Sequence, residues 1–104
     1  MGEPAPVKLQ VQRVARAFEA AVNGADARRW REDFSSDFAE RDSELGPLLE
    51  RTERADLIGT VANRTLLHLH LTDGDTRVVE LLWLDREGGW RIEDARVFSL
   101  LPGE

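Results

Sequence analysis

The order of two hydrophobic periodicities along the chain limits what it can fold into. In the first part, apolar residues recur every three to four positions, the spacing of one face of an α-helix: Val7, Val11, Val14, Phe18 and Val22. From Asp56 onward, the sequence changes to Leu, Ile, Val and Thr with turn signals about every ten residues, which is typical of antiparallel strands. Helices therefore come first and a sheet second, so an α+β protein is predicted.

Three helices are predicted before the sheet. The first ends at Asn23-Gly24, because these residue types tolerate the left-handed conformation just past a helix end. Asp26 is placed to cap a second helix, with a break at Ser35-Ser36-Asp37 as the alternative. The apolar residues of this second helix follow at four-residue steps: Ala27, Trp30, Phe34 and Phe38. Gly46-Pro47 indicates a short third helix with proline at its first position.

Four strands are predicted as a meander, over residues 56–62, 64–72, 76–86 and 90–99, with glycine-bearing turns at 72–75 and 86–89. Alternation divides the side chains of the middle strands between two faces. The first face is dry and carries Leu67, Leu69, Leu71, Val79, Leu81 and Trp83. The second is mixed and carries Leu66, His68, His70, Val78, Glu80 and Leu82.

The last predicted strand contains a break in its alternation. Trp90 and Ile92 alternate, but the apolar set then shifts to Ala95 and Val97. A β-bulge between Asp94 and Ala95 would produce this shift. Because bulges bend sheets, the concave face is expected to wrap around the helices.

Composition excludes several classes of protein. The 104-residue chain has no cysteine, which excludes a disulfide framework, a thiol nucleophile and cysteine-ligated metal sites. Its length suits one domain over 1–104, with residues 1–6 as a disordered lead. A net charge of −6 repels phosphate backbones, so no nucleic-acid partner is predicted, and the arginines at 28, 29 and 31 are interpreted as a solvated helix turn.

No membrane partner is predicted either. No apolar run approaches the ~18 residues of a membrane span. Residues 1–6 have neither the basic start nor the apolar stretch of a signal peptide, so the cytoplasm is the expected location. A chain that begins after a removed signal or lipid anchor would look the same.

Helices followed by a meander that ends in Gly88-Gly89-Trp90-Arg91-Ile92 resemble the NTF2-like superfamily, the cystatin-like, cone-shaped α+β fold. The resemblance covers Val7 to about Leu100 and implies N-terminal helices packed on the concave face of a curved four-stranded antiparallel sheet. In the superfamily this arrangement encloses a pocket that serves as the active site of ketosteroid isomerases, dehydratases and polyketide cyclases, and in other members is a core or a ligand cavity. The isomerase pattern needs a pocket tyrosine and two carboxylic acids. This chain has no tyrosine, so no catalytic residue is transferred to it.

Several side chains are candidates for a site. A pocket for a small apolar ligand would be lined by Trp30, Phe34, Phe38, Trp83 and Trp90, although aromatic residues at helical spacing are more often core. His68 and His70 share a strand face about 7 Å apart, so with Glu80 they could chelate a metal; the alternatives are a half-buried pair and a pH-responsive interface. The three catalytic candidates are these two histidines and Asp94, a general base if it faces inward and a surface ion-pair partner otherwise. No cofactor is predicted.

Excess apolar residues on the mixed face point to self-association. Leu66, Val78, Leu82 and Leu84 lie opposite the predicted core, and Phe98, Leu100 and Leu101 continue the apolar character of the chain. A monomer rarely leaves such a sheet face in water, so a two-fold homodimer through the sheet is predicted. The favoured function is a non-catalytic, self-associating or protein-interaction module. The alternatives are a small apolar-ligand-binding module and a small isomerase, dehydratase or hydrolase.

Overall fold

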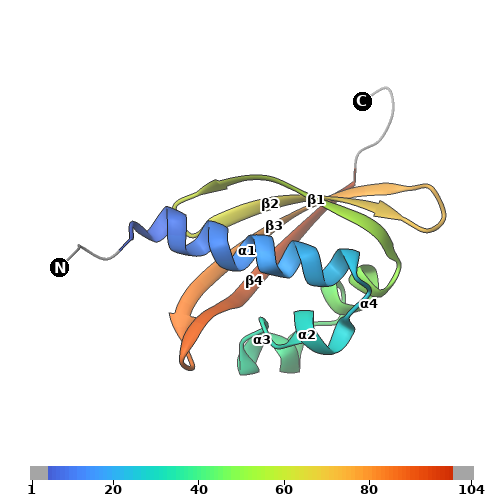
Figure 1. Ribbon diagram of the computed structural model, residues 1–104. Coiled ribbons are helices and arrows are strands. Elements are labelled where there is room, and N and C mark those ends of the chain that lie inside the picture. Colours follow the sequence, from blue (N-terminus) through green and yellow to red (C-terminus); the bar gives the residue numbers. More distant parts are fainter. Residues whose placement is uncertain (1–4, 100–104) are drawn as a thin grey trace.

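Helices precede strands in the computed structural model, which describes residues 5–99 (Figure 1). The helices are α1 (Val7–Asn23), α2 (Ala27–Arg31), α3 (Ser36–Arg41) and α4 (Leu45–Glu50). The strands are β1 (Thr52–Val61), β2 (Arg64–Leu71), β3 (Thr76–Arg86) and β4 (Gly89–Ser99). They form one antiparallel sheet in the order β1-β2-β3-β4, curved and not closed, which confirms the predicted α+β class and meander. Residues 1–4 of the predicted lead, and Leu100 and Leu101, lie outside the described residues.

The α1 helix lies along the inner face of the sheet. The predicted stripe supplies its buried side chains, which are Val11, Ala15, Phe18, Ala21 and Val22. The helix ends at Asn23, as predicted, where the Gly24 N–H donates to the Ala20 carbonyl (2.9 Å). The residue with positive φ is not Gly24 (φ −84°) but Ala25 (φ 55°), so the predicted position of the left-handed residue was wrong.

The second predicted helix is divided, but the break lies at residues 32–35, so that Ser36 and Asp37 of the predicted break belong to α3. α2 starts at its predicted cap, since the Asp26 side chain accepts from the Arg29 N–H (3.1 Å). Residues 33–35 then bond to β4 instead of continuing the helix. The Ile92 N–H donates to the Asp33 carbonyl (2.6 Å), and the Ser35 N–H donates to the Ile92 carbonyl (3.0 Å). These two bonds satisfy backbone groups that a continuous helix would otherwise pair internally.

Side-chain oxygens accept from N–H groups in the first turn of each of the next two helices. The Ser35 hydroxyl accepts from the Phe38 N–H (3.0 Å) and so starts α3. The Asp42 carboxylate accepts from the N–H groups of Leu45 (2.9 Å) and Gly46 (2.8 Å) and so starts α4. Proline stands at the third position of α4, not the first as predicted, and still falls in the first turn, where its missing N–H costs nothing.

The strand boundaries follow the predicted alternation except at β1, which begins at Thr52 rather than at residue 56. The predicted bulge in β4 exists, but it lies at Glu93, because Trp83 pairs with Ile92 and Leu82 pairs with Asp94. Beyond the bulge, Ala95 faces Leu81 across the strands. The shift of the apolar set that the sequence indicated therefore occurs one position earlier.

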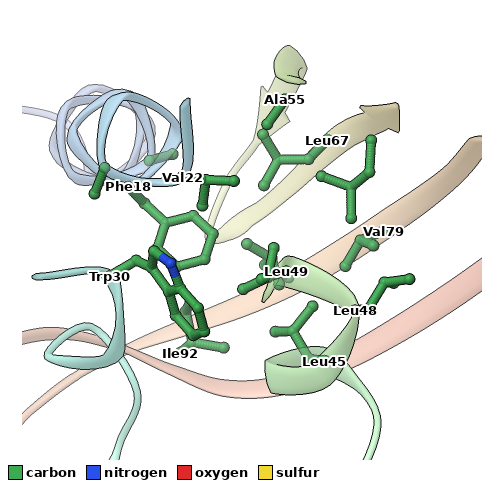
Figure 2. Close-up of a cluster of buried hydrophobic side chains, with 14 of the residues drawn as sticks. Phe18, Val22, Trp30, Leu45, Leu48, Leu49, Ala55, Leu67, Val79 and Ile92 are labelled. Atoms are coloured by element: carbon green, nitrogen blue, oxygen red, sulfur yellow. The ribbon is translucent and has the colours of Figure 1, made fainter. Parts of the chain in front are cut away.

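The core fills the space between the helices and the inner face. Figure 2 shows side chains from α1, α2, α4 and the sheet converging on one cluster. The six predicted dry-face residues of β2 and β3 are each at most 1% exposed, which confirms that face. Trp83 meets the Phe18 ring edge to face at 6.0 Å, and its indole N–H donates to the Thr65 hydroxyl (3.0 Å).

Both free edges of the sheet are partly covered. At β1, the Asn23 side-chain amide bonds twice to the Ala55 backbone, accepting from its N–H (2.7 Å) and donating to its carbonyl (2.9 Å). One turn earlier in α1, the Glu19 carboxylate accepts from the Leu57 N–H. At β4, residues 33–35 pair with Ile92, and Arg41 donates to the Glu93 carbonyl. Such covers block the pairing of an edge strand with another chain.

We expect Asn23→Ala to lower the free energy of unfolding by about 1–2 kcal/mol, because two hydrogen bonds to the β1 edge are lost. Asn23→Asp is the matched control. It keeps an acceptor for the Ala55 N–H but turns a carboxylate oxygen toward the Ala55 carbonyl and adds a negative charge at the C-terminal end of α1, so its loss should be at least as large. Urea unfolding followed by tryptophan fluorescence measures both. An Ala variant as stable as wild type would show that Asn23 does not hold this edge.

Candidate functional site

The five aromatic residues predicted to line a pocket lie in and around the core. Trp30, Phe38 and Trp83 are at most 3% exposed, while Phe34 and Trp90 are half-buried against the same cluster. Phe34 lies between Trp30 (5.7 Å between ring centroids) and Phe38 (5.0 Å). The Trp90 indole N–H donates to the Gln10 side chain (3.1 Å). Three of the five rings thus belong to the packed core, which was the other interpretation of their spacing.

Phe34 also lines a hollow among the short helices. Its volume is about 220 Å³, and its other lining residues are Arg31, Ala39, Asp42, Gly46 and Pro47. The Arg31 guanidinium pairs with Glu50 and lies 5.0 Å from the Trp30 ring. The hollow is smaller than the roughly 300–1,000 Å³ of typical small-molecule sites. It has room for a fragment-sized molecule.

His68 and His70 lie together on the outer face of the sheet, the face away from α1. Their rings stack with centroids 4.4 Å apart and planes inclined by 36°. The His70 Nε2 atom lies 3.2 Å from an Asp56 carboxylate oxygen and 3.1 Å from an Arg54 guanidinium nitrogen. The His68 Nε2 atom is buried and has no hydrogen-bond partner. The structure thus brings the two imidazoles together, next to an ion pair on β1.

Glu80, predicted to join the histidines, pairs instead with Arg64 (3.2 Å). In the β2–β3 register, Glu80 lies opposite Leu66 and Val78 lies opposite His68. Glu80 therefore belongs to the next cross-strand pair on this face, not to the pair of His68. The acid nearest His70 is Asp56, on the neighbouring strand that the prediction did not use. Within residues 5–99, no group of three or more His, Asp or Glu side chains has an arrangement suited to a metal ion.

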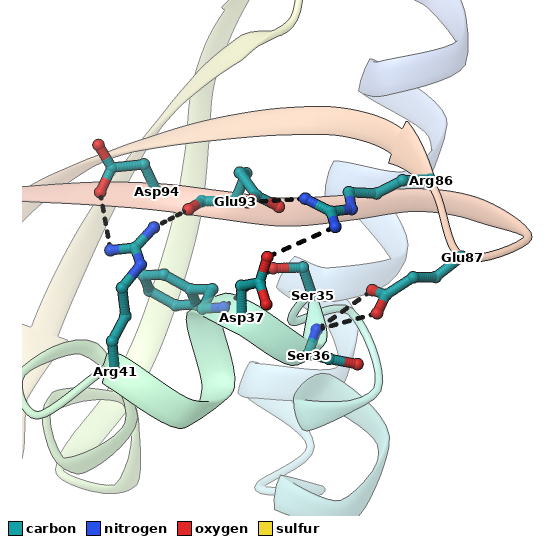
Figure 3. Close-up of polar contacts among 9 residues, drawn as sticks. Ser35, Ser36, Asp37, Arg41, Arg86, Glu87, Glu93 and Asp94 are labelled. Carbon is teal, nitrogen blue, oxygen red and sulfur yellow. Dashed lines mark hydrogen bonds and ion pairs between the residues drawn. The ribbon is translucent and has the colours of Figure 1, made fainter.

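Asp94 lies on the outer face and not inward, because the bulge at Glu93 rotates it away from the core. Its side chain is 53% exposed and lies 3.6 Å from the Arg41 guanidinium of α3 (Figure 3). Arg41 and Arg86 link α3 to the last two strands, since Arg86 bonds to Glu93 (2.9 Å) and reaches Asp37 (3.5 Å). Asp94 therefore belongs to a group of surface ion pairs, the alternative to a general base.

The β3–β4 turn is also joined to α3. The Glu87 carboxylate accepts from the Ser36 N–H (3.1 Å). Hydrogen bonds from the side chain and the backbone of Ser36 lower the pKa of Glu87. Figure 3 shows this contact beside the arginine pairs. The whole cluster thus holds α3 against the hairpin.

The outer face carries the apolar side chains predicted for a dimer interface. Leu66 and Leu84 are 38% and 37% exposed, and Phe98 is 47% exposed, while Val78 and Leu82 are half-buried. Val78 pairs across the sheet with both His68 and Phe98, so these three side chains form one row over β2, β3 and β4. An apolar group of this kind on an exposed sheet face is typical of a contact surface.

Charged residues of both signs lie among these apolar side chains. The acids and arginines pair within the chain, as Arg54–Asp56 (3.2 Å) and Arg64–Glu80 (3.2 Å) show. Asp94 pairs with Arg41, and Arg96 lies opposite Glu80. Over the middle of this face, three arginines balance three carboxylates: Arg54, Arg64 and Arg96 against Asp56, Glu80 and Asp94. A fourth arginine, Arg91, lies opposite Leu84 at the end of β3. The outer face is therefore close to neutral in a chain whose net charge is −6.

Asp33 is a buried acid that the sequence analysis did not single out. It is 6% exposed, and burial raises its pKa above the ordinary 3.8, while the Arg29 guanidinium 3.3 Å away opposes the rise. The cause of its burial is the pairing of residues 33–35 with β4, a contact between distant parts of the chain. No local pattern could have shown it.

Searches of protein-family models, of curated proteins and of solved structures found no match to this chain. The geometry alone therefore defines the class: a small α+β fold with helices on one face of a four-stranded antiparallel sheet, compatible with an NTF2-like cone. In residues 5–99, the helices fall short of the length and apolarity that crossing a membrane requires.

Asp33→Asn should stabilise the protein at neutral pH. A raised folded-state pKa means that Asp33 contributes stability below its unfolded pKa and that this contribution is lost as pH rises through the folded pKa. The variant carries no charge to bury, so its advantage should shrink as pH falls through the raised pKa of Asp33. Thermal unfolding from pH 7.5 to about pH 4.5 measures the difference. Asp37→Asn, at an exposed acid, is the control and should change little; an Asp33 variant that is less stable at every pH would contradict the prediction.

Proposed function

We propose that this chain is an NTF2-like domain that works as a non-catalytic, self-associating module, a two-fold homodimer formed through the outer face of its sheet. The observation that carries the proposal is the group of exposed and half-buried apolar side chains on that face: Leu66, Val78, Leu82, Leu84 and Phe98. Removing apolar surface from water is worth about 25 cal/mol per Å². A second copy that covers these side chains would gain this energy twice.

Charge favours a second copy as the occupant. Two molecules that each carry −6 repel one another unless the surfaces in contact are locally neutral. In a two-fold interface each surface meets itself, so an excess of one sign would be repeated on both sides. The outer face avoids a large excess of either sign, because it carries four arginines and three carboxylates.

The sheet edges and the size of the face support the same arrangement. Asn23 and Glu19 cover part of the β1 edge, and residues 33–35 with Arg41 cover part of the β4 edge. The outer face is therefore a better surface for a second copy than either edge. Four strands ~4.8 Å apart and about eight residues long at ~3.3 Å per residue project to roughly 500 Å². Side-chain relief increases the accessible area toward the ~800 Å² per partner of a standard interface.

The inner face supports a non-catalytic role. Its side chains on β2 and β3 are apolar and closely packed against α1, with Thr65 bonded to the Trp83 indole. The polar candidates for chemistry, Asp94, His68 and His70, lie on the opposite face. Surface contacts, not reactions in a cavity, are what this distribution favours.

Leu82→Glu should convert the dimer into a folded monomer, because it places a carboxylate in each copy at the apolar centre of the contact. Phe98→Glu is a second variant at a more exposed position and should act in the same way. Leu9→Glu is the control, since Leu9 is 52% exposed on α1, away from the outer face. Sedimentation velocity measures the masses, and circular dichroism checks the fold. A protein that stays dimeric after both changes would remove the outer face as the interface.

A second candidate function is the binding of a small apolar molecule in the hollow among α2, α3 and α4. The observation that favours it is the Phe34 ring at the wall of the hollow, with Trp30 5.7 Å behind it. An apolar fragment there would contact one face of a half-buried ring. Binding of such a fragment would change the fluorescence of Trp30.

The dye 1-anilinonaphthalene-8-sulfonate should bind wild type saturably and quench tryptophan fluorescence if the hollow accepts ligands. Ala39→Phe, at an exposed wall position, should fill the hollow and abolish binding without unfolding the protein. Absence of saturable binding to wild type, or unchanged binding to the variant, would count against this second function.

A further inference from the structure

We infer that the outer face makes self-association depend on pH: uptake of protons by the stacked imidazoles of His68 and His70 separates the two copies. The inference rests on the proposed function, because it concerns the regulation of the same face. Histidine is the side chain that ordinarily changes charge between pH 5 and 8. Both histidines of the chain lie on this face.

The His70 ring has two partners on β1 that require opposite states of its Nε2 atom. Arg54 only donates hydrogen bonds, so its nitrogen 3.1 Å away requires Nε2 to be an acceptor, which means a neutral ring. The Asp56 carboxylate only accepts, so its oxygen 3.2 Å away requires Nε2 to carry a proton. A proton on His70 therefore favours Asp56 and repels Arg54. The ion pair that Arg54 and Asp56 now form (3.2 Å) would have to adjust.

The His68 ring has no such partner. Its Nε2 atom is buried and unpaired, and its nearest ring is His70, 4.4 Å away. Protonation of both rings would place two positive charges in contact and leave a buried N–H without an acceptor. A charged His68 would therefore have to expose its Nε2 atom, which disturbs the surface that a second copy covers.

The neighbours from the other strands offer no compensation. In the register, β1 presents Asp56 opposite His68 and Arg54 opposite His70, and this acid is already shared by Arg54 and His70. On the other side, β3 presents the uncharged Val78 and Thr76, and β4 continues the row with Phe98. The next acid along β3, Glu80, is paired with Arg64. α1 covers the opposite face. Among the described residues, no free carboxylate faces His68.

A contact between two copies excludes water from this row and so raises the cost of each charge. If each copy must keep one imidazole neutral to associate, two protons are excluded per dimer. Each excluded proton weakens association by up to about tenfold per pH unit. We expect the dimer dissociation constant to rise by roughly tenfold to a hundredfold between pH 7.5 and about pH 5.5.

The experiment compares three proteins by sedimentation equilibrium at these two pH values and constant ionic strength. Wild type should show the rise in dissociation constant. The double variant His68→Gln, His70→Gln contains no histidine and should show nearly the same constant at both pH values. Glu80→Gln is the matched control, because it removes a carboxylate from the same face but keeps both imidazoles, and it should retain the rise. Near-ultraviolet circular dichroism of the tryptophans reports whether each protein stays folded.

The outcomes separate this inference from the proposed function. A wild type that is monomeric at pH 7.5 would overturn both. A dimer whose dissociation constant does not change with pH, or a double variant that keeps the full change, would overturn the pH dependence and leave the dimer. Loss of the near-ultraviolet signal of wild type at the lower pH would also overturn it, because dissociation would then follow from unfolding.

Discussion

The contact between α1 and the inner face of the sheet determines what the remaining surfaces can do. Five side chains of α1 are buried against the sheet and the short helices, and each large one contributes about 1.5–3 kcal/mol by leaving water. The same helix places Asn23 and Glu19 at the free edge of β1, where they occupy backbone groups that another strand could use. One helix thus covers the inner face and protects an edge. The outer face is left as the broad surface of the sheet that no helix within residues 5–99 covers.

A single extra residue in β4 divides the late strands between the two surfaces. Without the bulge at Glu93, strict alternation from Ile92 would turn Asp94 toward the core and Ala95 toward water. With it, Ala95 and Val97 complete the inner face and Asp94 reaches Arg41 on α3. The bulge therefore keeps a carboxylate out of a region where burial would be costly. It also gives α3 a partner on the sheet, which the short helix needs because a helix of six residues is unstable alone.

Sequence periodicity predicted what depends on neighbours along the chain and missed what depends on distant contacts. The stripe of α1, the β3 boundaries and the two faces of the meander follow from spacing, because each is fixed by the regular geometry of one element. The break after α2 and the burial of Asp33 follow from hydrogen bonds to Ile92, which no local pattern encodes. The histidine pair on the outer face shows the same difference between local and distant contacts. Alternation placed His68 and His70 on one face, but the partnership with Asp56 depends on the β1 register, and β1 begins earlier than its sequence suggests.

The distribution of ionisable groups explains why a nearly neutral outer face can still respond to its surroundings. Arginine and carboxylate side chains ordinarily keep their charges near neutral pH. Histidine is different, because it is the side chain that ordinarily changes charge between pH 5 and 8. His68 and His70 occupy the row that joins the ion pair on β1 to Val78 and Phe98. A proton on that row changes the net charge of a surface that is otherwise nearly balanced, and it does so where apolar side chains would meet. The position of the histidines, more than their number, therefore links protonation to the hydrophobic contact.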